Sequence, residues 1–191
     1  MLDEALVEFC SPTLAGIKTG NIFTARAQDK EVREEISALN RILVKKGLRL
    51  IPLKKNRKGT LVYLYRPSRL EKDLEFPEAR LILEEKGYPC GCPDRCVVEL
   101  IKHLVSDEDF PHEIGLFLGY PPADVKGFMN SPCEGVKCVG CWKVYGNEKE
   151  AKKTFARYDK CRDIYREETK KGKPLDDLIV DTREKALRLA I

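Results

Sequence analysis

The chain has 191 residues, of which 42% are hydrophobic and 35% are charged, a balance typical of a globular protein with a charged surface. The net charge of +4 comes from 35 basic and 31 acidic residues, which is too even to indicate nucleic acid or an anionic membrane as a partner. The acidic N-terminus does not resemble a signal peptide, and no apolar run approaches the roughly 20 residues of a membrane helix, so we expect a cytoplasmic protein.

The N-terminal part of the chain predicts two short helices. Residues 2–9 carry apolar side chains at helical spacing. Ser11-Pro12 then indicates the start of a second helix over 12–18, because Ser is a favoured N-cap and Pro suits the first helical position. Cys10 would lie just outside that helix N-terminus, where backbone amides lower the pKa of a thiol. Cys10 is therefore a candidate nucleophile, and a buried structural thiol is the alternative.

A longer helix and a β-hairpin follow. Apolar residues at helical spacing predict a helix over 29–46, which ends at Gly47. Residues 48–53 and 61–65 predict two strands that are joined by a turn at 56–59. Because the second of these strands is apolar at nearly every position, we expect it to lie in the centre of a sheet.

The middle of the chain combines helices with a cysteine-rich segment. Helices are predicted at 69–75, 77–86 and 93–105. The segment 88–96 lies between the last two and is a candidate local appendage. It contains three of the eight cysteines, Cys90, Cys92 and Cys96.

The second half of the chain predicts two further strands and three helices. Residues 113–118 form a short apolar run that is interpreted as a third strand, with a short helix as the alternative. Residues 138–145 are rich in β-branched and aromatic residues and predict a fourth strand. One helix is predicted to start at Pro121-Pro122, and two more are predicted over 148–170 and 182–189.

These elements predict a single α+β or α/β domain over residues 1–191. We expect a mixed sheet of about four strands that is covered by helices. The two most apolar strands, 61–65 and 113–118, would be neighbours in its centre. The sequence contains no internal repeat and no low-complexity segment that would divide the chain.

The clearest chemical pattern is the spacing of Cys133, Cys138 and Cys141. A Cys-x4-Cys-x2-Cys spacing occurs in the plant-type [2Fe–2S] loop, whose fourth cysteine lies farther along the chain, and Cys161 would take that place here. The same four thiols could instead bind a zinc ion with tetrahedral geometry. Cys138 and Cys141 also form a C-x-x-C pair, which is suited to dithiol redox chemistry.

The trio Cys90, Cys92 and Cys96 is the second candidate metal group, because three soft ligands lie within seven residues. The expected compartment is reducing, where cysteines serve as metal ligands, redox groups or buried thiols more often than as disulfides. The alternative to any metal or cluster is that all these cysteines are small buried hydrophobic residues.

His112 and Glu113 are candidates for acid–base chemistry. On a strand, adjacent residues point to opposite faces, so the two are not expected to act as one pair. Glu113 lies in an apolar run and needs a partner there, for which Lys126, Lys143 or an arginine is expected. The sequence contains no motif of the common nucleotide-binding, zinc-protease or serine-hydrolase classes.

The block F-P-H-E-I-G-L-F-L-G-Y-P at 110–121 is followed by D-V-x-G-F at 124–128 and by C-x-G-x-W-K-V-Y-G at 138–146. These motifs, together with S-P-T-L-A-G-I-K at 11–18, resemble a bacterial family known as domain of unknown function 3793, which is common in anaerobes. The family carries His before the first Cys, where this chain has Phe9, so the resemblance implies no metal ligation by such a pair here. The resemblance implies no established activity, fold or cofactor. Its association with flavodoxin and iron-handling genes favours a redox partner protein such as a flavodoxin.

The sequence therefore predicts a cytoplasmic protein that binds a metal ion or an iron–sulfur cluster through cysteines, in redox or iron physiology. One alternative is a thiol-dependent enzyme that uses Cys10, or Cys138 and Cys141 near His112. Another alternative is an interaction module with only buried thiols.

Overall fold

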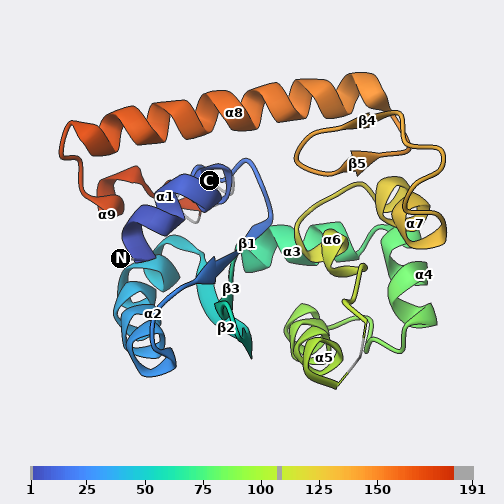
Figure 1. The fold of residues 1–191 in the computed structure, drawn as a ribbon, viewed down its shortest axis with the longest axis horizontal. Helices are drawn as coiled ribbons and strands as arrows, with labels where there is room; N and C mark the ends of the chain where they lie inside the picture. Colours follow the sequence, from blue (N-terminus) through green and yellow to red (C-terminus); the bar gives the residue numbers. More distant parts are fainter. Residues whose placement is uncertain (1, 107–108, 183–191) are drawn as a thin grey trace, which may run out of the picture. The chain divides into compact units, whose positions relative to one another are not determined.

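A computed structural model gives the structure of the chain and describes residues 2–106 and 109–182 (Figure 1). Helices and strands are both present, and the predicted α+β class is confirmed. The chain forms two compact units. Unit 1 combines the residues up to Ser68 with those from Lys160 onward, and unit 2 consists of Arg69–Asp159. The prediction of a single domain over residues 1–191 stays a prediction.

Unit 1 contains a three-stranded antiparallel sheet of β1 (Gly20–Ala25), β2 (Arg49–Asn56) and β3 (Gly59–Tyr65). The strand order is β1-β3-β2, so the predicted hairpin and the central position of its second strand are confirmed. Strand β1 was missed, because its six residues include Gly, Asn and Thr and show only a weak alternation of apolar side chains.

Two helices cover one face of this sheet. They are α1 (Leu2–Leu14) and α2 (Asp29–Leu43), and a 3₁₀ turn, η1 (Val44–Lys46), continues α2. Their apolar side chains pack into one core with those that strands β1, β2 and β3 direct to the same face. The helix predicted over 29–46 is thus confirmed, and it ends at Gly47, whose φ of 78° suits a glycine at this position.

The prediction of a new helix at 12–18 is wrong, because α1 runs through Ser11 and Pro12 to Leu14. Leu2, Leu6, Cys10 and Leu14 are spaced four residues apart and are all buried. Their burial on one face holds the helix together across Pro12, which sits in its last turn. Packing of the apolar face therefore outweighs the local capping pattern.

Arg66 follows β3 directly and is fully buried. Its guanidinium donates hydrogen bonds to the carbonyl oxygens of Thr13 (2.7 Å), Leu14 (2.7 Å), Val180 (2.8 Å) and Lys46 (3.3 Å) and to Oγ1 of Thr182 (3.0 Å). One side chain thus joins the end of α1, the end of η1 and the C-terminal segment that follows the short helix α9 (Leu175–Leu178). The carbonyls of Thr13 and Leu14 also accept backbone N–H groups, so Arg66 binds the second lone pair of each oxygen.

Unit 2 consists mainly of helices and one small hairpin. The helices are α3 (Pro67–Leu74), which begins at the unit boundary, α4 (Pro77–Glu85), α5 (Pro93–Ser106), α6 (Ile114–Phe117), α7 (Pro122–Asn130) and the first half of α8 (Glu148–Lys170). The hairpin consists of β4 (Cys138–Val139) and β5 (Lys143–Val144). The helices predicted at 69–75, 77–86, 93–105 and 148–170 and after Pro121-Pro122 are confirmed, whereas the one at 182–189 lies almost wholly outside the described residues.

The strand predicted at 113–118 is wrong, and so is its predicted position beside 61–65. This run is the turn and short helix α6, in which the N–H groups of Leu116 and Leu118 donate to the carbonyls of Glu113 and Ile114. A short apolar run does not distinguish a buried strand from a buried helix. The fourth predicted strand is two strands of two residues each, because the chain turns at Gly140.

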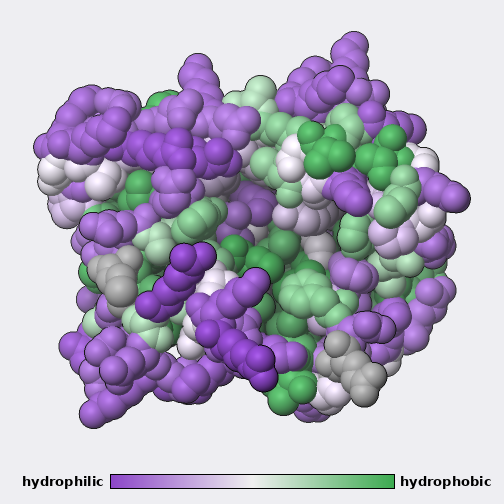
Figure 2. Space-filling view, viewed as in Figure 1, coloured by the Kyte–Doolittle hydropathy of each residue, from purple (hydrophilic) through white to green (hydrophobic). Residues whose placement is uncertain are grey.

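On the face drawn in Figure 2, the surface of helix α8 and that of the β4–β5 hairpin differ in hydropathy. Helix α8 is mostly hydrophilic there, whereas apolar residues are visible over the β4–β5 hairpin. Val139 in that hairpin is 69% exposed. Within the part of the chain that the structure describes, no helix has both the length and the apolar character needed to cross a membrane.

We predict that Arg66→Met lowers the free energy of unfolding by at least about 3 kcal/mol, because the buried carbonyl groups around it lose charged donors. Urea unfolding followed by far-UV circular dichroism measures this change. The matched control is Arg57→Met in the exposed β2–β3 turn, which should change stability by less than about 0.5 kcal/mol. Equal effects of the two substitutions would contradict the role of Arg66.

Candidate functional site

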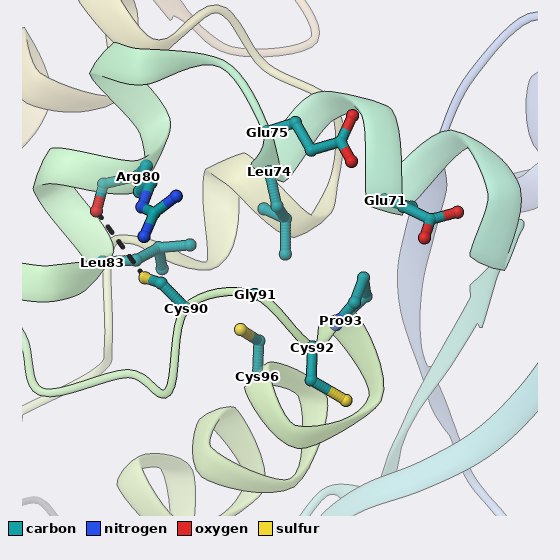
Figure 3. Close-up of a pocket in the computed structure, with 10 residues that line it drawn as sticks. All are labelled: Glu71, Leu74, Glu75, Arg80, Leu83, Cys90, Gly91, Cys92, Pro93 and Cys96. Carbon is teal, nitrogen blue, oxygen red and sulfur yellow. Dashed lines mark hydrogen bonds between the residues drawn. The ribbon is translucent and has the colours of Figure 1, made fainter.

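Three cysteines line one small pocket in unit 2 (Figure 3). The pocket has a volume of about 100 Å³ and lies where the α4–α5 loop meets the start of α5. Cys90, Cys92 and Cys96 form one side of it, and Glu71 and Glu75 of α3 are among its other lining residues. The sequence named these three cysteines as a second metal group, and the structure places all of them at one pocket.

Local backbone geometry brings these cysteines together. Gly87 ends α4 with a φ of 78°, and Gly91 has a φ of 106° with open space around it. A residue with a side chain rarely adopts either conformation, so the two glycines permit the tight loop. Pro93 then begins α5, whose first turn includes the hydrogen bond from the Cys96 N–H to the Cys92 carbonyl (3.0 Å).

The thiols of this pocket are turned in different directions. The sulfur of Cys90 lies 3.8 Å from the carbonyl oxygen of Arg80, and that of Cys96 lies 3.5 Å from the carbonyl of Pro89. Figure 3 shows the sulfur of Cys92 pointing away from both. Burial raises the pKa of Cys96 to about 11, with further contributions from the neighbouring thiols, and burial also raises the pKa of Cys90.

No preformed metal site is present in residues 2–106 and 109–182, since no three His, Cys, Asp or Glu side chains are grouped around one point. The trio in the pocket would have to reorient to coordinate an ion together.

The segment 88–96 is a loop and the start of a helix. Its predicted role as an appendage stays a prediction, although Tyr88 and Cys96 are buried.

The first candidate metal group has members in both units. Cys133 and Cys141 are exposed in unit 2, and Cys138 lies half-buried in β4. Cys161 belongs to the apolar core of unit 1, and burial raises its pKa. A binding site formed by all four thiols stays a prediction. The environment of Cys161 fits a packing role.

The predicted position of Cys10 just outside a helix N-terminus is wrong. Cys10 lies inside α1, is completely buried, and belongs to the apolar core of unit 1. Burial raises the pKa of its thiol to about 12, whereas a position at a helix N-terminus would have lowered it. The structure therefore favours the alternative of a buried structural thiol.

Glu113 is buried and has different partners from those expected. Its Oε1 accepts a hydrogen bond from the Tyr88 hydroxyl (2.9 Å) and lies 3.3 Å from Nδ1 of His103. The Tyr88 and His103 rings also pack edge to face, with centroids 4.8 Å apart. Burial and then the charge of Glu113 raise the pKa of Tyr88 strongly. Nothing in the sequence spacing of these three residues indicates this cluster.

Asp124 is buried at the start of α7 and organises the segment around the β4–β5 hairpin. Its Oδ2 accepts a hydrogen bond from Nε1 of Trp142 (2.7 Å). Its Oδ1 accepts from the backbone N–H groups of Tyr145 (2.8 Å) and Gly146 (2.7 Å). A single carboxylate thus fixes the hairpin and the residues that follow it against α7.

Two glycines permit close packing in the same region. A Cβ atom at Gly140 would lie 2.3 Å from the ring of Phe155 on α8, and one at Gly127 would lie 2.4 Å from the ring of Tyr145. Such distances are far below van der Waals contact. These glycines are therefore required by space, and neither adopts a positive φ.

A second pocket, called the aromatic pocket below, lies between α6, α7 and the β4–β5 hairpin. It has a volume of about 210 Å³. Trp142 stacks on Tyr120 with ring centroids 4.7 Å apart and packs edge-on against Phe155 at 4.6 Å. The structure brings His112 and Cys141 together in the lining of this pocket. The sequence identified both residues as candidates but did not predict that aromatic side chains would pack beside them.

The family described as "Protein of unknown function (DUF3793)" matches residues 6–179, and the chain therefore belongs to this family. No curated protein and no solved structure matches the chain. The matched range includes Asp124, the aromatic pocket and the pocket lined by Cys90, Cys92 and Cys96, called the thiol pocket below.

We predict that Asp124→Asn destabilises unit 2 by about 1–3 kcal/mol, because an amide NH₂ would face an N–H donor in place of one acceptor oxygen. Trp142 is the only tryptophan, so urea unfolding followed by its fluorescence reports on this region. Glu134→Gln, on the exposed loop before the hairpin, is the matched control and should have an effect below about 0.5 kcal/mol. A neutral Asp124→Asn substitution would contradict the assigned role.

Alkylation should separate the thiols by exposure. At pH 8, iodoacetamide is expected to modify Cys133 and Cys141 in the folded protein and to leave Cys10 unmodified, because its thiol is buried and has a pKa of about 12. Peptide mass spectrometry after a timed reaction measures this difference. Rapid modification of Cys10 without unfolding would disprove its buried position.

Proposed function

We propose that the protein binds a soft metal ion, zinc or ferrous iron, through Cys90, Cys92 and Cys96, and acts in redox or iron physiology. The observation that carries this proposal is that three thiols from one seven-residue segment line a single pocket. Thiolate ligands favour such metals. A reducing compartment such as the cytoplasm, where cysteines are available as metal ligands, fits this proposal, and we place the protein there.

The size of the pocket favours one ion. A volume of about 100 Å³ holds an ion with one or two water molecules, since a water molecule occupies about 30 Å³. Glu71 and Glu75 line the same pocket, so a carboxylate or a water can complete four-coordination around three thiolates. This arrangement favours a single ion over an iron–sulfur cluster.

Reorienting the thiols costs much less free energy than metal binding contributes. Turning the side chain of Cys92 toward the other two involves a rotamer change that costs about 1 kcal/mol. Structural zinc sites contribute about 10–16 kcal/mol at neutral pH. Binding must release the protons of Cys90 and Cys96, whose pKa values are raised, so the affinity for metal should increase with pH.

A redox partner protein such as a flavodoxin belongs to the same proposal. The resemblance of the central motifs to a family associated with flavodoxin and iron-handling genes supports it. A ferrous ion at this site would serve an accessory or electron-transfer role, whereas zinc, which has no redox chemistry, would serve an accessory role.

Metal analysis of anaerobically purified protein tests this function. The full chain, incubated with zinc or ferrous iron and desalted, should retain about one ion per chain. Cys92→Ser and Cys96→Ser should each abolish this retention. The matched control Cys133→Ser, which removes an exposed thiol of the same unit, should leave it unchanged. Retention that depends on Cys133 and not on Cys96, or no retention at all, would disprove the proposed site.

A further inference from the structure

The aromatic pocket has the size of a small ring compound. Its volume is about 210 Å³, whereas an apolar cavity of about 150 Å³ is enough to bind benzene. Pockets for drug-sized ligands and cofactors measure about 300–1,000 Å³. The pocket therefore suits a single ring with one small substituent.

The walls of the pocket match the flat faces of such a ring. Tyr120, Val125, Phe128 and Trp142 supply aromatic and aliphatic surface. Trp142 is held by its hydrogen bond to Asp124 and by its stacking on Tyr120. Because these side chains are already fixed by packing, a ligand would pay little conformational entropy to order them.

The charged groups of the pocket favour an anion. Lys143 and His112 both line it. The ammonium of Lys143 lies 5.5 Å from the centroid of the Phe128 ring and donates to the carbonyl of Pro132 (2.8 Å), which leaves two of its three N–H donors for a ligand. The one carboxylate in the lining, Asp124, already accepts three hydrogen bonds from protein N–H groups.

We propose that the aromatic pocket binds a small single-ring aromatic carboxylate. Its ring would lie against Trp142 and Phe128, and its carboxylate would accept hydrogen bonds from Lys143 and from a ring N–H of His112. This site is separate from the thiol pocket, which shares no lining residue with it.

Benzoate is the probe that tests the proposal. Titration of the full-length protein should change the fluorescence of Trp142 in a saturable manner, with a Kd on the order of 0.1–1 mM for a ligand of this size. Benzamide has the same shape without the charge and should bind at least about fivefold more weakly. Ligand-observed NMR gives a second readout that does not depend on Trp142.

Two lysine variants form a matched pair. Lys143→Met keeps the aliphatic stem and should weaken benzoate at least about fivefold, with little change for benzamide. Lys137→Met removes an exposed lysine that donates to the carbonyl of Gly146 in the same segment but does not line the pocket, and it should leave binding unchanged. Circular dichroism checks that both variants are folded.

Three outcomes would overturn the proposal. They are the absence of saturable binding up to about 10 mM benzoate, equal binding of benzoate and benzamide, and equal effects of the two lysine substitutions. None of these outcomes depends on metal binding, so this test and that of the thiol pocket fail independently.

Discussion

The geometry of unit 2 depends on the hydrogen bonds that the carboxylate of Asp124 accepts. The carboxylate accepts hydrogen bonds from the indole N–H of Trp142 and from two backbone N–H groups. These bonds fix the hairpin and the turn after it against the start of α7. A buried carboxylate is costly without such partners, and hydrogen bonds to a charged acceptor are among the stronger ones. Once this contact is made, the position of Trp142 follows, and with it one wall of the aromatic pocket. Close approaches at Gly127 and Gly140 complete the same packing.

The eight cysteines fall into classes set by their surroundings. Cys10 and Cys161 pack in the apolar core of unit 1, where burial keeps their thiols protonated. Cys133 and Cys141 are exposed in unit 2, and Cys138 lies half-buried in β4. The trio that begins at Cys90 combines a shared pocket with partial access, which is the condition a soft metal ion requires. The metal proposal therefore depends on where the fold places each thiol. Sequence spacing alone favoured the group that begins at Cys133.

Sequence patterns predicted most helices and the main hairpin, because amphipathic spacing and Gly or Pro boundaries are local properties. They failed where tertiary burial decided the outcome. The helix that runs through Pro12 and the helical turn at 113–118 both result from burial of apolar side chains. Of the site, the sequence identified the cysteines and His112. It missed Asp124, which accepts hydrogen bonds from residues about twenty positions later, and His103, which contacts Glu113 on another element.

In the proposed function, three thiolates of the segment 90–96 hold one metal ion. X-ray absorption at the zinc edge, on full-length protein loaded with one equivalent of zinc, tests it most directly. The account predicts about three sulfur ligands near 2.3 Å and one oxygen ligand near 2.0–2.2 Å. A shell of four sulfurs would point to the group that includes Cys133, Cys138 and Cys141, and a shell of only oxygen and nitrogen would contradict a thiolate site altogether.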